Sequence, residues 1–293
     1  MCSCTDSRSD EFQVIESESQ YDFHSIEVFD GTLYATGGDV WNKSNLVYST
    51  NGTSWSTDSL TNKSIFDLYT DGQSLYGVGN DGYIFSGQPE LKLTRTKFWG
   101  LLRAFTSSNE GFIAAGGKDF NKGWIYKVNS ELRIDTAHIF KNEILDVTCS
   151  NSGKCIACGY GVILTSNDAG VTWQRSTENG DYYNSIAINS KDEIFIVGYS
   201  GTIIKSKDDG ESWEKLKNGH SPLANNKPFR TIKFQEDIGI IVGDNGLIWI
   251  SQNAGKDWED ISINTDLDIF DFTFYQSNII CVSEAGQIFN IKI

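Results

Sequence analysis

Three aspartates, Asp67, Asp146 and Asp271, are the residues that most directly suggest a shared chemical role. They hold matching places in three copies of an internal repeat, on strands that we expect to lie innermost, around a common axis. Carboxylates that converge on an axis could hold a cation. They could also accept hydrogen bonds from the adjacent copy of the repeat, and we favour this structural role, with no metal and no cofactor. The same place in other copies is held by Ser25, Ser185 and Thr231.

Cysteine is the second residue type with chemical potential, and six cysteines stand at positions 2, 4, 149, 155, 158 and 281. Cys149 and Cys155 flank an expected hairpin turn at residues 150–154, so they could be cross-strand neighbours. We favour a buried thiol cluster at this place, and a Cys149–Cys155 disulfide is the alternative. Zinc is disfavoured because no histidine or second cysteine pair stands beside them.

The N-terminal sequence Met1-Cys2-Ser3-Cys4 leads into a polar stretch rich in serine and aspartate. A cysteine in this setting resembles the mature start of a bacterial lipoprotein, where the cysteine carries lipid and a flexible tether follows. We therefore predict that residues 1–10 are a flexible tail, a candidate lipoprotein tether. The same feature predicts a cell-envelope, extracytoplasmic setting, with membrane contact only through this anchor.

The charge balance excludes some classes of partner. The chain of 293 residues has 24 basic and 39 acidic side chains, which gives a formal net charge of -15. Nucleic-acid binding needs lysine and arginine to displace counterions from phosphates, so a nucleic-acid partner is not expected. No window holds the run of about 18 apolar residues that a membrane-spanning helix needs. With only 3 prolines and 28 glycines, the composition suits many short strands joined by tight turns.

A tryptophan-containing turn motif recurs along the chain. Residues 166–173, 206–213 and 251–258 align without gaps, and a shorter copy spans 49–55. We identify these segments as Asp-box turns, in which an Asp or Asn can bond backbone N–H groups and a glycine tolerates positive φ. The tryptophan offers a large apolar face for packing. We predict structural roles for Asp168, Gly170, Trp173, Asp208, Gly210, Trp213, Asn253, Gly255 and Trp258.

The segments that precede each motif divide the chain into units. Each unit holds an apolar strand, a turn, a second apolar strand that ends in glycine, a short loop and a third strand. The units span residues 23–60, 63–98, 99–140, 142–179, 181–218 and 227–263, and a last unit from 268 holds three strands. The strand at 11–16 supplies the missing fourth strand and removes the exposed edges. The sequence predicts an all-β, seven-bladed β-propeller with four-stranded blades, as one domain over residues 11–293.

The chain resembles the Asp-box (BNR) propellers on these motifs, over nearly its whole length. Within them it looks most like the photosystem II assembly and stability factor family, seven-bladed propellers that bind partner proteins. That family is noted for a surface patch of arginines, whereas this chain has arginine only at 8, 95, 103, 133, 175 and 230. Sialidases also carry Asp-boxes, but their early Phe/Tyr-Arg-Ile-Pro motif is absent, and Phe229-Arg230-Thr231-Ile232 lies late in the chain.

The candidate binding residues lie on the propeller face formed by the loops between second and third strands and the links between blades. Loops on a rigid scaffold commonly carry function. Aromatic side chains beside cationic and amide groups could recognise a peptide or a sugar. The candidates are Trp41, Lys43, Trp99, Arg103, Phe120, Tyr182, Tyr183, His220 and Arg230.

The sequence predicts a function in binding rather than in catalysis. We name no catalytic residue, and His220 has no evident carboxylate or nucleophile partner. The favoured interpretation is a non-enzymatic propeller scaffold that binds a protein or peptide partner as an extracytoplasmic assembly or accessory factor. The alternative is a carbohydrate-binding or glycoside-hydrolase-like envelope protein, since a pair of acidic residues flanking a glycosidic bond could lie among the many carboxylates.

Overall fold

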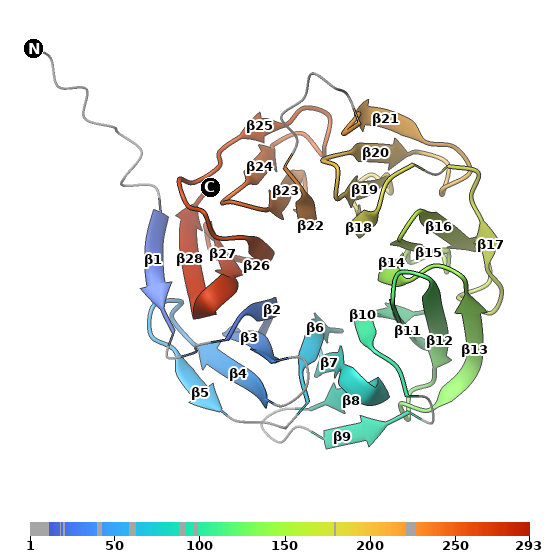
Figure 1. The fold of residues 1–293 in the computed structure, drawn as a ribbon, viewed down its shortest axis with the longest axis horizontal. Coiled ribbons are helices and arrows are strands. Elements are labelled where there is room, and N and C mark those ends of the chain that lie inside the picture. The colour runs from blue at the N-terminus through green and yellow to red at the C-terminus, as the bar shows by residue number, and fades with distance from the viewer. Residues whose placement is uncertain are drawn as a thin grey trace, which may run out of the picture.

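In a computed structural model, the described residues form seven four-stranded antiparallel sheets, arranged as blades around a central channel (Figure 1). They are residues 12–17, 19, 21–39, 43–58, 63–87, 92–96, 99–178, 180–220 and 227–293. Within each blade the strands follow one another outward from the channel in chain order, except in the last blade. The predicted seven-bladed propeller is confirmed. None of the helical segments in the described ranges is long and apolar enough to cross a membrane.

The strands take equivalent places in each blade. The innermost strands are β2 (Phe23–Phe29), β6 (Ile65–Thr70), β10 (Leu102–Ser108), β14 (Ile144–Cys149), β18 (Tyr183–Ile188), β22 (Phe229–Gln235) and β26 (Ile269–Tyr275). The second strands are β3 (Thr32–Asp39), β7 (Leu75–Gly79), β11 (Gly111–Lys118), β15 (Cys155–Gly159), β19 (Ile194–Gly198), β23 (Ile238–Gly243) and β27 (Asn278–Ser283).

The outer half of each blade is made of the remaining strands. The third strands are β4 (Lys43–Ser49), β8 (Tyr83–Ser86), β12 (Lys122–Val128), β16 (Val162–Ser166), β20 (Ile203–Ser206), β24 (Ile248–Ser251) and β28 (Gln287–Lys292). The outermost strands are β5 (Ser56–Asp58), β9 (Lys92–Arg95), β13 (Ile134–Phe140), β17 (Gln174–Arg175), β21 (Glu214–Lys217), β25 (Glu259–Asp260) and β1 (Phe12–Glu16). Single 3-10 turns, η1 (Asn80–Gly82) and η2 (Glu284–Gly286), precede β8 and β28.

The ring is closed by its N-terminal strand, as predicted. β1 pairs antiparallel with β28, with Phe12 opposite Ile291 and Glu16 opposite Gln287. Blade seven therefore takes one strand from the start of the chain and three from its end (Figure 1). This closure covers the edge that β28 would otherwise present to solvent. The predicted tail at residues 1–10 lies outside the described residues.

The core consists of short apolar strands, and most core clusters contain residues from two neighbouring blades. β19 is buried along its whole length, and Phe195 from it packs with Phe229 and Ile241 of blade six. A similar cluster joins Ile156 of blade four to Tyr183 and Ile196 of blade five. Burying both faces of the second strands explains why these runs are continuously apolar rather than alternating.

The glycine at the end of most second strands has a steric cause. A Cβ added at Gly79 would lie 1.9 Å from the Ser64 carbonyl oxygen, and one at Gly159 would lie 2.0 Å from that of Glu143. Each of these oxygens belongs to the residue just before the innermost strand of the same blade. Since real Cβ atoms do not come this close, glycine is required where the second strand passes the incoming link.

The channel is surrounded by a β-bulge in every blade. Each innermost strand shifts register by one residue near its start, as between Ile65 and Asp67 or between Ile144 and Asp146. A bulge leaves one residue unpaired and redirects its side chain. The bulge residues are His24, Phe66, Arg103, Leu145, Asn184, Arg230 and Phe270.

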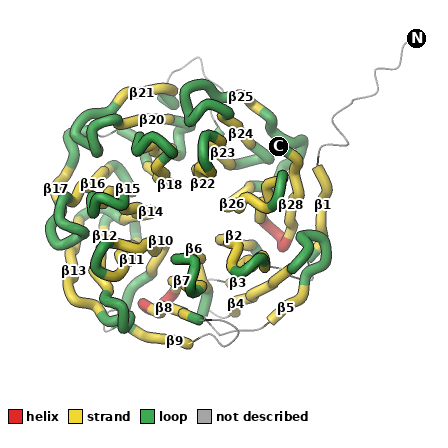
Figure 2. Tube along the Cα trace, turned by 180° about the vertical axis from the view of Figure 1, so that it is seen from behind, coloured by secondary structure: helices red, strands yellow, loops and turns green. Residues whose placement is uncertain are grey.

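The two faces of the ring differ in how their connections are built, as seen by comparing Figures 1 and 2. We call the side with the turns between first and second strands, and between third and fourth strands, the turn face. The side with the loops between second and third strands, and with the links between blades, is the loop face. The predicted Asp-box turns lie on the turn face, and those predicted binding residues that the structure describes lie toward the loop face.

The turn-face motifs share one hydrogen-bond pattern. Ser166 Oγ accepts from the Gly170 N–H at 2.9 Å, and Asp168 Oδ1 accepts from the Thr172 N–H at 2.8 Å. Ser206 and Asp208 make the equivalent bonds in blade five, as do Ser251 and Asn253 in blade six. The glycines have φ values of 82°, 87° and 80° at Gly170, Gly210 and Gly255, while Trp173, Trp213 and Trp258 pack against clusters shared with the preceding blade.

Candidate functional site

Three aromatic side chains from three different blades meet on the loop face. Phe120 comes from the loop after β11, Tyr160 from the loop after β15, and Tyr182 from the link before β18. The rings of Phe120 and Tyr160 are T-shaped at 4.6 Å between centroids, and those of Tyr160 and Tyr182 lie edge-on at 4.9 Å. We call Phe120, Tyr160 and Tyr182 the aromatic ladder. Phe120 is 64% exposed and Tyr182 is 53% exposed, so the ladder presents apolar rings to solvent.

The backbone that carries Phe120 is in an unfavourable conformation. Phe120 has φ of 61° and Asp119 before it has φ of 56°. A bulky residue in the left-handed region costs of the order of 1–3 kcal/mol, and such residues gather at functional sites. Neighbouring groups hold this conformation in place, because Glu143 Oε2 accepts from the Phe120 N–H at 3.0 Å and the Glu143 N–H donates to the Phe120 carbonyl at 3.1 Å.

Glu143 is buried, and its second oxygen holds a bulge residue of blade three. Oε1 accepts from Arg103 Nε at 2.8 Å, so one carboxylate joins the link of blade four to the Phe120 loop and to Arg103. The guanidinium of Arg103 also lies 5.7 Å from the centroid of the Phe66 ring. A buried carboxylate that is fully hydrogen-bonded in this way is a rigid anchor. Arg103 is therefore engaged inside the molecule, at the rim of the channel.

Asp181 anchors the other end of the aromatic ladder. Its Oδ1 accepts from the N–H groups of Tyr182 at 2.7 Å and Ser200 at 3.2 Å. The Tyr199 N–H donates to the Tyr182 carbonyl at 2.8 Å, which places a second exposed tyrosine beside the ladder. Asp181 Oδ2 is buried and, among the described residues, has no hydrogen-bond partner. It fills the space beside Gly198, where a Cβ would lie 2.6 Å from it.

Trp99 forms a separate aromatic platform in the link between blades two and three. Its ring is 74% exposed, and the guanidinium carbon of Arg95 lies 3.6 Å from its centroid. Arg95 also reaches within 5.6 Å of the Tyr83 ring. A cation over an aromatic face is attracted by the negative potential of the ring. This platform is thus already covered by a cation of its own chain.

The other predicted binding residues lie in different environments. Tyr183 is buried between blades four and five, so we correct its assignment from binding to core packing. Arg230 is held by Asp244 at 2.5 Å and Asp268 at 2.9 Å. His220 Nε2 contacts the Gly180 carbonyl oxygen. Trp41 lies outside the described residues, and so does the side chain of Lys43.

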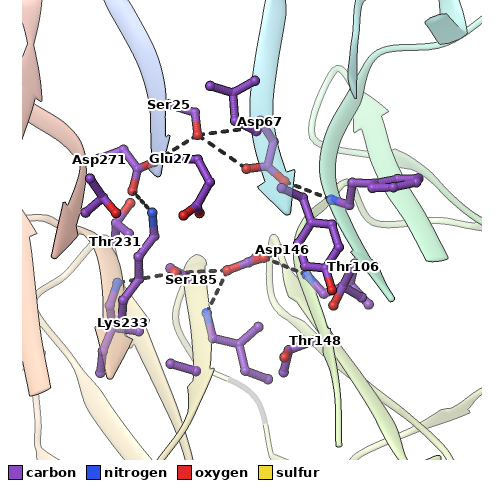
Figure 3. Close-up of a pocket in the computed structure, with 18 of the residues that line it drawn as sticks. Ser25, Glu27, Asp67, Thr106, Asp146, Thr148, Ser185, Thr231, Lys233 and Asp271 are labelled. Atoms are coloured by element: carbon purple, nitrogen blue, oxygen red, sulfur yellow. Dashed lines mark hydrogen bonds and ion pairs between the residues drawn. The ribbon is translucent and has the colours of Figure 1, made fainter. Parts of the chain in front are cut away.

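The central channel is a polar cavity of about 570 Å³, and its aspartates bind neighbouring blades (Figure 3). Asp67 Oδ2 accepts from the Phe105 N–H at 2.8 Å, and Asp146 Oδ2 accepts from the Ile186 N–H at 2.9 Å. Asp271 Oδ2 accepts from the Ile26 N–H at 3.0 Å, and Ser25 and Ser185 accept equivalent bonds in two further blades. This is the interblade role that we favoured from sequence, and these bonds join five pairs of neighbouring blades.

Electrostatics in the channel follow from burial. Desolvation raises the pKa of Asp67 well above its usual range and raises that of Asp146 to about 6. Lys233 Nζ pairs with Asp271 Oδ1 at 2.7 Å and donates to the Phe272 carbonyl at 2.8 Å. In the described ranges, no group of three or more His, Cys, Asp and Glu is arranged to hold a metal ion.

The cysteines of blade four differ from the favoured prediction. Cys149 and Cys155 form a disulfide between the paired strands β14 and β15, so the buried thiol cluster was wrong for these two residues. Cys158 and Cys281 are free and buried. The pairing arises because Cys149 and Cys155 are direct cross-strand neighbours, whereas Cys158 lies beyond them along β15, opposite Asp146.

Comparisons with known proteins bear on the family. Residues 181–269 match the family model described as photosynthesis system II assembly factor YCF48. The chloroplastic photosystem II stability/assembly factor HCF136 of Arabidopsis thaliana is 31% identical over 107 residues, a match that covers 33% of this chain and 25% of that protein. A structure of YCF48 bound to D1 peptide aligns with a TM-score of 0.70 at 15% identity, covering 97% of both chains. By these matches the chain resembles the YCF48-like BNR β-propellers.

The propeller fold is shared beyond this family. YCF48 from Cyanidioschyzon merolae aligns with a TM-score of 0.70 at 11% identity, covering 96% of this chain and 98% of that one. The virginiamycin B lyase of Staphylococcus aureus aligns with a TM-score of 0.75 at 11% identity, covering 97% and 100%. At these identities the likeness concerns the fold alone, because one propeller scaffold hosts many functions.

Proposed function

We propose that this chain is a non-enzymatic propeller that binds a protein or peptide partner through the aromatic ladder on its loop face. The observation that carries the proposal is Phe120, whose ring is 64% exposed while its backbone is held in the left-handed region by the buried Glu143. Within the chain the ring contacts Tyr160, and most of its surface remains exposed to solvent. The strained backbone of Phe120 is explained if its ring makes its main contacts with a partner.

The aromatic ladder has the properties of an interface hot spot. Aromatic residues dominate binding energy at the centre of interfaces, and rigid display lowers the entropy lost on binding. Backbone hydrogen bonds fix Tyr160 and Tyr182, since the Tyr160 N–H donates to the Glu143 carbonyl at 3.0 Å and the Tyr182 N–H to Asp181. The surface is therefore organised before a partner arrives.

The family supports a peptide or protein ligand. One solved YCF48 structure is described as bound to D1 peptide, and the curated relative is described as a stability/assembly factor. We extend to this chain the binding of a polypeptide segment and a role as an assembly or accessory factor. Its channel aspartates accept bonds from neighbouring blades, an arrangement that favours a scaffold over a carboxylate pair for glycoside hydrolysis.

We further propose an extracytoplasmic setting. The Cys149–Cys155 disulfide supports it, because disulfides persist in oxidising compartments and are rare in the cytosol. A lipid anchor on the N-terminal cysteine would place the propeller at a membrane surface of the envelope. Mass spectrometry of the protein from its native host tests both features, through the mass of the N-terminal peptide and the oxidation state of Cys149.

The test compares two exposed apolar residues of the same blade. Phe120 is 64% exposed on the loop face, and Ile139 is 63% exposed on the outermost strand β13. A photocrosslinking amino acid at each position, expressed in the native host, identifies the partner, which is then purified and titrated. We expect Phe120→Ala to weaken its binding at least tenfold and Ile139→Ala to change it less than twofold. Equal effects, or saturable binding only on a glycan array, would reject the proposal.

A further inference from the structure

Two aromatic surfaces on the loop face differ in one respect, which is the presence of a cation. Trp99, in the link between blades two and three, is stacked by Arg95 at 3.6 Å. In the described ranges, no lysine or arginine makes a cation–π contact with Phe120, Tyr160 or Tyr182. The chain thus contains an intramolecular example of a guanidinium on an exposed aromatic ring, and a separate set of rings without one.

The arginines next to the aromatic ladder are directed elsewhere. Arg103 is bound to Glu143. Arg175 donates through Nη2 to the Gly161 carbonyl at 2.8 Å and through Nη1 to Asn142 Oδ1 at 3.2 Å. Lys118 and Lys122 flank Phe120 in sequence, and Lys118 lies 3.9 Å from the Asp119 carboxylate. Among the described residues, none of these side chains is recorded over a ring of the ladder, so the rings are open to a cation from another molecule.

Negative charge lies beside Tyr182, at one end of the ladder. Asp181 is buried next to Tyr182, and its Oδ2 has neither an ion pair nor a hydrogen bond among the described residues. An uncompensated carboxylate strengthens the attraction of a cation placed over the adjacent ring, since the two potentials add in a poorly solvated place. The formal net charge of -15 also favours encounter with a basic partner.

We infer that the aromatic ladder receives a lysine or arginine side chain from a basic segment of the partner, seated on the tyrosine rings as Arg95 is seated on Trp99. The inference rests on the proposed function and specifies the chemistry of its ligand. An acidic segment would meet Asp181 and the net negative charge of the chain. A purely apolar segment would leave the Asp181 carboxylate uncompensated.

The experiment uses three blocked twelve-residue peptides, Ac-(Gly-Ser-Arg)4-NH2 and its citrulline and glutamate counterparts. Citrulline keeps the shape of arginine and removes its charge. The full-length protein carries 3-fluorotyrosine, and the resonances of Tyr160 and Tyr182 are assigned by substituting each with phenylalanine. We expect the arginine peptide to shift these two resonances saturably, with at least tenfold tighter binding than the citrulline peptide in low salt. The resonance of Tyr48, an exposed tyrosine on β4, should stay unchanged.

A matched pair of charge variants isolates Asp181. Asp181→Asn removes the charge under the ladder, and Asp192→Asn removes the same charge from an exposed turn of the same blade on the turn face. We expect Asp181→Asn to weaken binding of the arginine peptide three- to tenfold and Asp192→Asn to change it less than twofold. If Asp181→Asn fails to fold, Tyr182→Leu serves instead, because it keeps apolar area and removes the ring; it should abolish the preference for arginine over citrulline.

The outcomes separate this inference from the proposed function. Equal binding of the arginine and citrulline peptides, or tighter binding of the glutamate peptide, overturns the basic-ligand inference while the crosslinked partner still depends on Phe120. Loss of that dependence on Phe120 overturns the proposed function itself. An arginine preference that survives Tyr182→Leu and Asp181→Asn places the cation elsewhere and also overturns the inference.

Discussion

The polar side chains of the turn face and of the loop face form different kinds of hydrogen-bonded contact. On the turn face, the same serine, acidic or amide residue and glycine satisfy the same backbone groups in blades four, five and six. On the loop face, single buried carboxylates, Glu143 and Asp181, hold exposed aromatic residues in place. Repetition on the turn face stabilises these three blades in the same way, whereas the loop face carries unique contacts in blades three to five. We therefore expect function where the repeat is broken.

The largest effect should come from the turn face. A Cβ at Gly255 would lie 2.4 Å from Cζ of the fully buried Phe195, and Gly255 has φ of 80°. We expect Gly255→Ala to lower the free energy of unfolding by about 2–4 kcal/mol, because it combines backbone strain with overpacking. Chemical denaturation measures this change. Peptide binding per folded molecule should stay the same.

The matched control for that variant is Gly72→Ala. Gly72 has φ of 82° on the turn face, but a Cβ there meets nothing within 4 Å. Gly72→Ala should lower the free energy of unfolding by only about 1 kcal/mol, because the left-handed conformation is its only unfavourable feature. If the two variants lose equal stability, contact with the neighbouring blade is not what fixes the Asp-box glycine.

The loop face should respond to the loss of its carboxylate anchor. Glu143→Ala removes the acceptor for the Phe120 N–H and leaves Arg103 without its ion pair. Unpaired groups at such a place cost about 1–3 kcal/mol in the free energy of unfolding. In contrast to Gly255→Ala, this variant should also weaken partner binding at least fivefold, because Phe120 is no longer held. Denaturation and titration of the same preparation distinguish the two faces.

Sequence reasoning gave the ring, its closure and the blade limits, because these depend on local patterns repeated along the chain. It missed Glu143, Tyr160 and Asp181, which act through contacts between neighbouring blades. Tyr182 and Tyr183 were placed together, yet one is exposed and the other buried. β18 begins between them, and successive residues of a strand point to opposite sides. The residue at which β18 begins decides which of the two tyrosines is buried, and no local pattern encodes that start.

A smaller effect is expected from the Cys149–Cys155 disulfide on the turn face. It closes a short loop, with a sequence separation of 6, for which chain entropy predicts a stabilisation of about 2 kcal/mol. Reduction should lower the midpoint of thermal unfolding by a few degrees without changing peptide binding. The double variant with serine at positions 149 and 155 should melt with the reduced protein and be insensitive to reductant. A loss of binding on reduction would link the two faces and weaken their separation.

The smallest effect concerns pH and compares a channel carboxylate with one on the turn face. Burial raises the pKa of Asp146 to about 6, so its neutral form is favoured in the folded state. Its contribution to stability is present below its unfolded pKa of 3.8 and is lost as the pH rises through 6. Relative to Asp146→Asn, the unmodified protein should lose about 1–2 kcal/mol between pH 4 and pH 7, allowing for water in the channel.

Asp208 on the turn face has the opposite sign. The Ser212 hydroxyl and backbone N–H lower its pKa to about 2, so its contribution is present above its unfolded value and is lost as the pH falls through 2. The stability difference between the unmodified protein and Asp208→Asn should therefore stay constant from pH 4 to pH 7. Denaturation curves of both variants across this range check the contrast. The comparison is between the pH dependences of the two stability differences, each taken between the unmodified protein and one variant. If the pH dependence is the same for Asp208→Asn and Asp146→Asn, burial in the channel does not set the titration of Asp146. Its bond to the Ile186 N–H would then keep the carboxylate charged.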